Sequence, residues 1–289
     1  MEKEKKHSAW LTALKVILIV IGSIAAILVG SYLFIKYYLG FDLIKIKNAI
    51  DLLNKDFSST TLISQPYSDE DISSAFYKMY SDNSIYTETD GNYTFNKQEL
   101  EESTLQSTAH LNNKELAGIF NLYIVNYQED LDISKGFQLK QIIFSNLVEN
   151  AENVSVDIEF VFEINLANAL KTDETISSLM SQYIPKKVII TSNSTLTYPK
   201  NHLSNYTFSN KDFKINNLSN NETNTVLDVF KMLKIVNETN EILTSANNMF
   251  FASLLGDEES DGFLSKFTDI DQCGFIENDG AILLEIKKV

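Results

Sequence analysis

The sequence predicts an α+β protein in which one N-terminal transmembrane helix is followed by a domain with an antiparallel sheet packed by helices. Three observations lead to this fold class. Residues 16–35 form an uncharged apolar run, later segments carry apolar residues at helical spacing, and residues 155–166 alternate between apolar and mostly polar side chains. We therefore divide the chain into a tail (1–15), an anchor helix (16–38), a juxtamembrane amphipathic helix (39–60) and an α+β domain (61–289).

The anchor prediction rests on the run from Val16 to Ile35. Thirteen of its twenty residues are Val, Ile, Leu or Phe, and Lys15 and Lys36 close it at its two ends. A helix of this length is about 30 Å long, which matches the hydrocarbon core of a bilayer. A cleaved signal peptide is the main competing interpretation, but the run is too long for one and no small-x-small cleavage site follows it. The only cysteine, Cys273, is too far along the chain to be a lipid-modified N-terminal cysteine.

Lysines lie on both sides of the run, so the positive-inside rule orients it only weakly. Four lysines precede the run, at positions 3, 5, 6 and 15, and four follow it, at 36, 45, 47 and 55. Long domains are translocated largely regardless of their charge. We therefore expect a single-pass signal-anchor protein of the cell membrane, with its N-terminus in the cytoplasm and its C-terminal domain extracytoplasmic.

The charge of the domain excludes several classes of partner. Residues 1–40 hold five lysines and two glutamates, so the remainder has 19 lysines against 37 acidic residues and a formal charge of −18. The chain contains no arginine, the residue best suited to bidentate recognition of phosphate and guanine. An acidic domain without arginine argues against nucleic-acid binding and against docking on anionic lipid headgroups beyond the anchor.

Two patterns near the membrane are typical of a homodimer. Gly22, Ala26 and Gly30 form a ridge of small residues that would let two transmembrane helices approach closely. Just after the run, apolar residues recur at steps of three and four, a seam of about two heptads. The seam suits packing of this helix either on its own domain or on a second copy, and it consists of Leu43, Ile46, Ile50, Leu53 and Phe57.

The domain itself is predicted from helix caps and strand alternation. Ser68 with Asp71, and Asn112 with Glu115, are capping signals before two apolar helical stripes, and a third helix is expected near Asn221. The segment Ser155 to Leu166 is the clearest strand, and half-polar strands of this kind belong mainly to antiparallel sheets. Its candidate partners are the segments Phe137 to Phe144, Lys187 to Tyr198 and Asp212 to Leu218. A separate hairpin is predicted near the C-terminus. Asn278, Asp279 and Gly280 suit a tight turn between two strands, Gly274 to Glu277 and Ala281 to Ile286.

No segment carries a recognisable catalytic, cofactor or metal motif, and we predict no such site residue. The tract from Asp257 to Gly262 resembles the first half of a calcium loop, but Thr268 stands where a bidentate glutamate is required. A second partial match, Asp269, Asp271 and Gly274, also lacks that glutamate. The histidines are His7, His110 and His202, none within a hydrolase motif.

The leading hypothesis is therefore a non-enzymatic binding or scaffold module presented at the membrane surface. The first version of this hypothesis to test, the apolar-ligand subtype, is that the domain binds an apolar or lipid-like ligand between the sheet and its helices. The alternative is a membrane-anchored hydrolase acting on envelope polymers, with carboxylates or a Ser/His pair that only folding brings together. A third hypothesis is a self-associating structural protein that uses the small-residue ridge and the seam. The ligand is not predicted.

Overall fold

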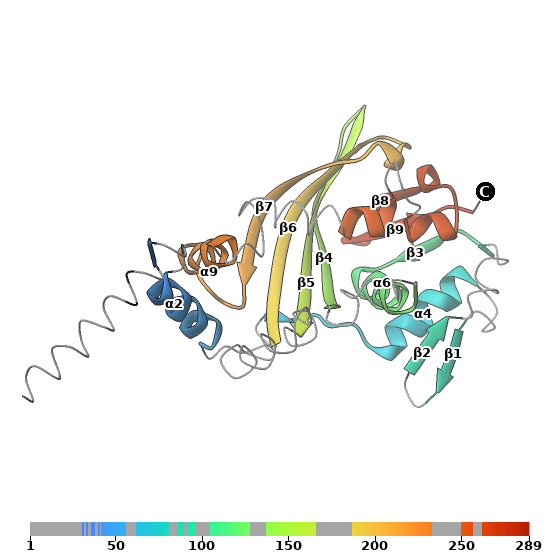
Figure 1. The fold of residues 1–289 in the computed structure, drawn as a ribbon. Coiled ribbons are helices and arrows are strands. Elements are labelled where there is room, and N and C mark those ends of the chain that lie inside the picture. Colours follow the sequence, from blue (N-terminus) through green and yellow to red (C-terminus); the bar gives the residue numbers. More distant parts are fainter. Residues whose placement is uncertain are drawn as a thin grey trace, which may run out of the picture.

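The computed structural model describes residues 31, 33, 36–37, 40, 42–55, 62–80, 86–89, 92–95, 105–127, 137–165, 187–232, 250–256 and 262–288. Figure 1 shows a long sheet in the middle of the molecule, with helices and a second small sheet beside it. The fold is α+β with antiparallel sheets packed by helices, as the sequence predicts.

Four antiparallel strands form the main sheet, in the spatial order β4-β5-β6-β7. They are β4 (Phe137–Glu149), β5 (Asn153–Asn165), β6 (Lys187–Pro199) and β7 (Thr207–Ile215). The predicted strand and its three partners are thus confirmed, although β7 begins five residues before the predicted start at Asp212. That start was missed because residues 207–211 are mostly exposed and polar, so they carry no alternation to detect.

The register of β5 and β6 is regular from Asn153↔Pro199 to Asn165↔Lys187, so their even-numbered residues share one face of the sheet. This face is apolar. Val156, Ile158 and Phe160 of β5 belong to the main core cluster, as does Leu196 of β6. Farther along β6, Val188 joins a second cluster. Buried Ser192 and Ser194 lie between the two apolar parts of β6.

Helices α4 (Asp69–Met79) and α6 (Asn113–Tyr127) cover the β4 side of the sheet (Figure 1). Both begin where the capping signals predict. At Ser68 the hydroxyl accepts from the Asp71 N–H, and the Asp71 carboxylate accepts from the Ser68 N–H, which is a complete capping box. Phe120 of α6 reaches the sheet through Phe250, whose ring centroid lies 5.1 Å from its own. The interior between sheet and helices is therefore filled by aromatic rings.

A three-stranded sheet in the order β3-β9-β8 closes the same side. It consists of β3 (Ala109–Leu111), β8 (Cys273–Asn278) and β9 (Ala281–Ile286). The predicted hairpin is confirmed, because Asp279 and Gly280 form its turn with φ of 50° and 78°. Buried Tyr198 of β6 links the two sheets, since its hydroxyl accepts from the Phe275 N–H at 2.8 Å. A further two-stranded sheet pairs β1 (Tyr86–Thr89) with β2 (Asn92–Phe95).

Helices α2 (Leu43–Leu53) and α9 (Asn220–Met232) lie beside β7, away from α4 and α6 (Figure 1). Ala49 and Leu53 of α2 are buried in the second cluster together with Val226 and Leu227 of α9. Of the predicted seam, Leu53 is thus buried within the same chain, and Ile46 packs against the cluster. Packing of this helix on its own domain is confirmed for these two residues, whereas pairing with a second copy stays a prediction.

The juxtamembrane helix is shorter than the predicted range of 39–60. Gly40 has a φ of 76° and Asp42 is the N-cap, so α2 begins only at Leu43, and Asn54 caps its other end. The apolar stripe predicts that a helix is present but not where it begins. The two features that set its start, the Asp42 carboxylate at the N-cap and the positive φ of Gly40, lie outside the stripe. Phe57 lies outside the described residues.

The predicted anchor falls almost wholly outside the described residues. Of the run from Val16 to Ile35, only Ser31 and Leu33 are described, and both are helical. Within the described part of the chain, no helix combines the length and the apolar character that crossing a membrane requires. The ridge of Gly22, Ala26 and Gly30 also lies outside this part.

Candidate functional site

The outer face of the main sheet carries a buried carboxylate, Asp157 of β5. Its Oδ1 accepts from the Thr195 hydroxyl at 2.6 Å and lies 2.6 Å from Lys211 Nζ, while its Oδ2 accepts from the Asn146 amide at 2.7 Å. Partial burial raises the pKa of Asp157, but these donors outweigh it and hold the pKa below its ordinary value of 3.8. The carboxylate is ionised and saturated, and it ties β5 to the other three strands of the sheet.

Glu159 lies two positions further along the same face of β5 and titrates in the opposite direction. Burial, which is the main cause, and the nearby Asp212 carboxylate raise the pKa of Glu159, and Lys214 opposes them only in part. Its direct cross-strand neighbour is Asn193, whose Oδ1 is buried and has no hydrogen-bond partner among the residues that the structure describes. A carboxylate with a lowered pKa beside one with a raised pKa is the combination that acid–base chemistry uses.

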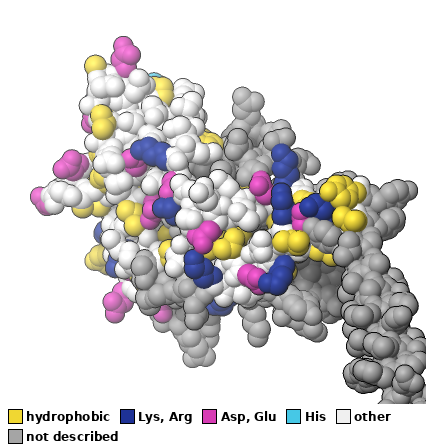
Figure 2. Space-filling model, turned by 90° about the vertical axis from the view of Figure 1, so that its left-hand side faces the viewer, with side chains coloured by type: hydrophobic (Ala, Val, Ile, Leu, Met, Phe, Trp, Pro, Cys, Tyr) yellow, Lys and Arg dark blue, Asp and Glu magenta, His cyan; other side chains and the backbone are white. Residues whose placement is uncertain are grey.

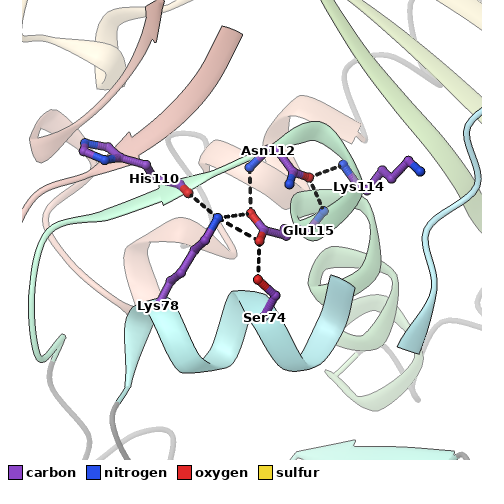
Figure 3. A network of polar contacts seen from close by, with 6 residues as sticks. All are labelled: Ser74, Lys78, His110, Asn112, Lys114 and Glu115. Atoms are coloured by element: carbon purple, nitrogen blue, oxygen red, sulfur yellow. Dashed lines mark hydrogen bonds and ion pairs between the residues drawn. The ribbon is translucent and has the colours of Figure 1, made fainter. Parts of the chain in front are cut away.

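A second polar cluster joins α4, β3 and α6 around Glu115, a side chain with only 3% exposure (Figure 3). Its carboxylate accepts from the Ser74 hydroxyl at 2.6 Å, from Lys78 Nζ at 2.8 Å and from the Asn112 N–H at 2.9 Å. Lys78 also donates to the His110 carbonyl at 3.0 Å. In return, Asn112 Oδ1 accepts from the Glu115 N–H at 2.9 Å, which completes the predicted cap of α6. Because all these groups are used internally, the cluster is a structural junction.

The two histidines of the domain each meet a carboxylate rather than a catalytic serine. His110 Nε2 lies 3.1 Å from Glu285 Oε1, directly across from it in the β3–β9 pair. His202 Nδ1 lies 3.3 Å from Asp271 Oδ2, and Asp271 also accepts from the Ser204 N–H at 2.9 Å. Burial raises the pKa of Asp271, but its contacts with Ser204 and His202 lower it overall. The side chain of Ser204 also hydrogen-bonds to Asp271, so this serine contacts the carboxylate through both its backbone and its side chain.

The two partial calcium loops have structural roles where they are described. Residues 257–261 lie outside the described part, but a Cβ on Gly262 would come within 2.1 Å of the Gly256 backbone nitrogen, so a close approach of two chain segments requires glycine there. In the second loop, Asp269 caps a short 3₁₀ helix (Ile270–Gln272), and Asp271 binds the Ser204 N–H. Among the residues that the structure describes, no group of three or more His, Cys, Asp or Glu side chains could hold a metal ion.

Asp42, the N-cap of α2, contacts both Lys36 at the end of the predicted anchor and the end of α9. Lys36 Nζ lies 3.0 Å from Asp42 Oδ2, and Asp42 Oδ1 accepts from the N–H groups of Ile44 and Lys45. The hydrogen bond from Lys36 is the main cause of the lowered pKa of Asp42. The Asp42 N–H in turn donates to Met232 Sδ at 3.2 Å. The start of α2 is thereby fixed against the end of α9.

No family model, no curated protein and no solved structure matches this chain. The proposed function therefore depends on residues and geometry alone.

Sequence reasoning found part of these arrangements. The sequence predicts the helix cap in which Asn112 pairs with Glu115. The other partners of the Glu115 carboxylate, Ser74 and Lys78, lie about 40 residues earlier in the chain, and no local pattern connects them to Glu115. The sequence alone places Asp157 and Glu159 on the solvent-facing side of a strand and says nothing more of them. The groups that make the surroundings of these two carboxylates different lie on β4, β6 and β7. The sequence of β5 alone therefore does not predict the difference.

We expect Lys78→Ala to lower the free energy of unfolding by about 2–4 kcal/mol, because it leaves the Glu115 carboxylate buried without its cation. Lys47→Ala is the matched control. It removes a lysine whose pair with Asp51 is 73% and 59% exposed, so we expect a loss of less than about 0.5 kcal/mol. Urea unfolding of the detergent-solubilised chain, followed by circular dichroism, measures both, and equal losses would contradict the structural role of the junction.

We expect the contribution of Asp157 to stability to be complete above about pH 4 and to be lost as the pH falls through its lowered folded-state pKa. Asp157→Asn should therefore reduce the dependence of unfolding free energy on pH below about pH 4, and should cost about 1–3 kcal/mol at pH 7. Thr195→Ala removes one donor but keeps the carboxylate, so its effect should be smaller. Acid unfolding curves of the three proteins check this, and an unchanged slope in Asp157→Asn would refute it.

Proposed function

We propose that this protein is a membrane-anchored binding or scaffold module, with residues 16–38 as its single anchor helix and residues 61–289 as an acidic extracytoplasmic domain. The observation that carries the proposal is the uncharged run from Val16 to Ile35, bounded by Lys15 and Lys36. The positions of the exposed apolar side chains support it. Among the described residues, four of the six exposed large hydrophobic side chains lie between Leu33 and Ile44, where the chain would leave the membrane.

A binding role is supported by the way the buried polar groups are used. Glu115, Asp157 and Asp271 direct their oxygens to donors of neighbouring elements and so fix the arrangement of helices and strands. A rigid domain of this kind presents its surface to a partner. The apolar-ligand subtype receives less support, because the rings of Phe160 and Phe250, with centroids 3.6 Å apart, occupy space between sheet and helices that such a ligand would need.

We expect the domain to be digested when intact cells carrying an epitope tag after Val289 are treated with protease. Loss of the tag without permeabilisation, together with resistance of the chain to carbonate extraction, is the result that the proposal requires. A cytoplasmic protein of the same cells is the control for cell integrity. A tag that is lost only after permeabilisation would reverse the topology and place the acidic domain in the cytoplasm.

The alternative, a hydrolase of envelope polymers, is favoured by one observation, the opposite pKa directions of Asp157 and Glu159 on one strand face. In such an enzyme Glu159 would be the general acid and Asp157 the ionised partner. Against it stands the saturation of Asp157 by three donors.

We expect the purified full chain to release no soluble fragments from isolated envelope polysaccharide, and Glu159→Gln to change nothing. Hydrolysis by the wild type that falls by about 100-fold or more in Glu159→Gln would establish the enzyme instead, since a general acid contributes that much. Lys214→Ala is the matched control, because it removes a charge beside Glu159 and leaves both carboxyl groups in place.

A further inference from the structure

We propose that the first turn of α2 is inserted into the membrane interface, at the boundary between headgroups and acyl chains, with Leu43 and Ile44 as the inserting side chains. The inference rests on the proposed anchor and adds how the domain is seated on the bilayer. It assigns a lipid-contacting surface to a segment outside the apolar run.

The exposure of these two side chains is the first observation. Leu43 is 43% exposed and Ile44 is 58% exposed, although α2 has a buried face formed by Ala49 and Leu53. Isolated exposed apolar residues are common on protein surfaces. Here, however, they follow Leu33 and Tyr37, which are 42% and 78% exposed, within one short stretch of chain. Figure 2 views the molecule from the α2 and α9 side and shows hydrophobic and lysine side chains next to one another.

The ion pair between Lys36 and Asp42 sets the depth of this turn. Lys36 is the first charged residue after the apolar run, so its ammonium group belongs at the headgroup level. Asp42 Oδ2 lies 3.0 Å from that group and therefore shares its depth. Because Asp42 is the N-cap of α2, Leu43 and Ile44 begin their helix at the membrane surface.

The opposite side of α2 is held by the domain, so this turn cannot bury its apolar side chains by rotating inward. Leu53 packs in the second core cluster, and the Leu53 carbonyl accepts from the Asn216 amide at 3.4 Å. At the other end, the bond from the Asp42 N–H to Met232 Sδ fixes the start of the helix against α9. The same contacts that expose Leu43 and Ile44 thus hold them in a fixed direction.

Lipid acyl chains are the occupant that this geometry fits. Interfacial helices combine inserted apolar side chains with lysines that extend to the headgroups, and Lys45 in this turn and Lys47 just after it are both exposed. The domain is strongly acidic, so the insertion is apolar in origin and does not require anionic lipid. A second copy of the chain is the competing occupant, and the experiment below distinguishes it.

The test uses the full chain reconstituted in phosphatidylcholine vesicles, with a fluorophore on a single introduced cysteine. The native Cys273 is buried, and burial raises the pKa of its thiol to about 12, so it stays unlabelled, which the wild type verifies as a blank. Ile44→Cys is the probe position and Leu43→Cys a second one. Val148→Cys is the matched control, because Val148 is 57% exposed, nearly the same as Ile44, but lies in β4 next to the β4–β5 turn.

We expect lipids that carry a quencher on the acyl chain to remove most of the fluorescence of Ile44→Cys and Leu43→Cys and to leave that of Val148→Cys unchanged. Vesicle flotation separates this inference from the proposed function. A chain that floats with the vesicles but shows no quenching at positions 43 and 44 keeps its anchor and overturns the insertion. A chain that does not float overturns both.

Two further results would also overturn the insertion. Equal quenching at positions 44 and 148 would mean that the whole domain lies on the bilayer rather than being seated by α2. Absence of quenching, together with disulfide-linked dimers of Ile44→Cys, would mean that a second copy covers the turn.

Discussion

The apolar face of the four-stranded sheet is the constraint on which the rest of the structure depends. Strands β5 and β6 are 13 residues long and paired along their whole length, which makes this face about 43 Å long. The longest helix among the described residues, α6, has 15 residues and is about 22 Å long. One helix therefore cannot cover the face. Segments from both ends of the chain are needed to keep it from water.

This requirement explains the two core clusters. α4, α6 and the β3-β9-β8 sheet enclose the larger one, whereas α2 and α9 enclose the smaller one beside β7. Buried Ser192 and Ser194 mark the boundary on β6, where the apolar sequence of the strand is interrupted. Tyr198 then joins the sheets by accepting from the Phe275 N–H, so the C-terminal hairpin becomes part of the main body.

The smaller cluster matters most for the proposed function. It brings α2, which follows the apolar run, into the same core as α9 and the end of β7. In the proposed function, an anchor attached through such a helix would hold the domain in one direction, because Asp42 at the start of α2 is itself bound to Lys36 and Met232. The opposite end, with the exposed Val148 and the β4–β5 turn, is then the part of the described structure farthest along the sheet from this attachment. Presentation of a surface to a partner requires this kind of fixed geometry.

The sequence by itself determined the features that depend on neighbouring residues. The alternation in β5, the capping residues Ser68 and Asn112, and the Asp279-Gly280 turn are local, because backbone hydrogen bonding and φ preferences act over a few positions. The tertiary structure alone decided which distant polar groups meet. Lys78 reaches Glu115, Lys211 reaches Asp157, and His202 reaches Asp271 from 37 to 69 residues away. Such pairs depend on the order of the strands and on helix packing. A contact between residues far apart in the chain produces no local or periodic sequence pattern from which it could be predicted.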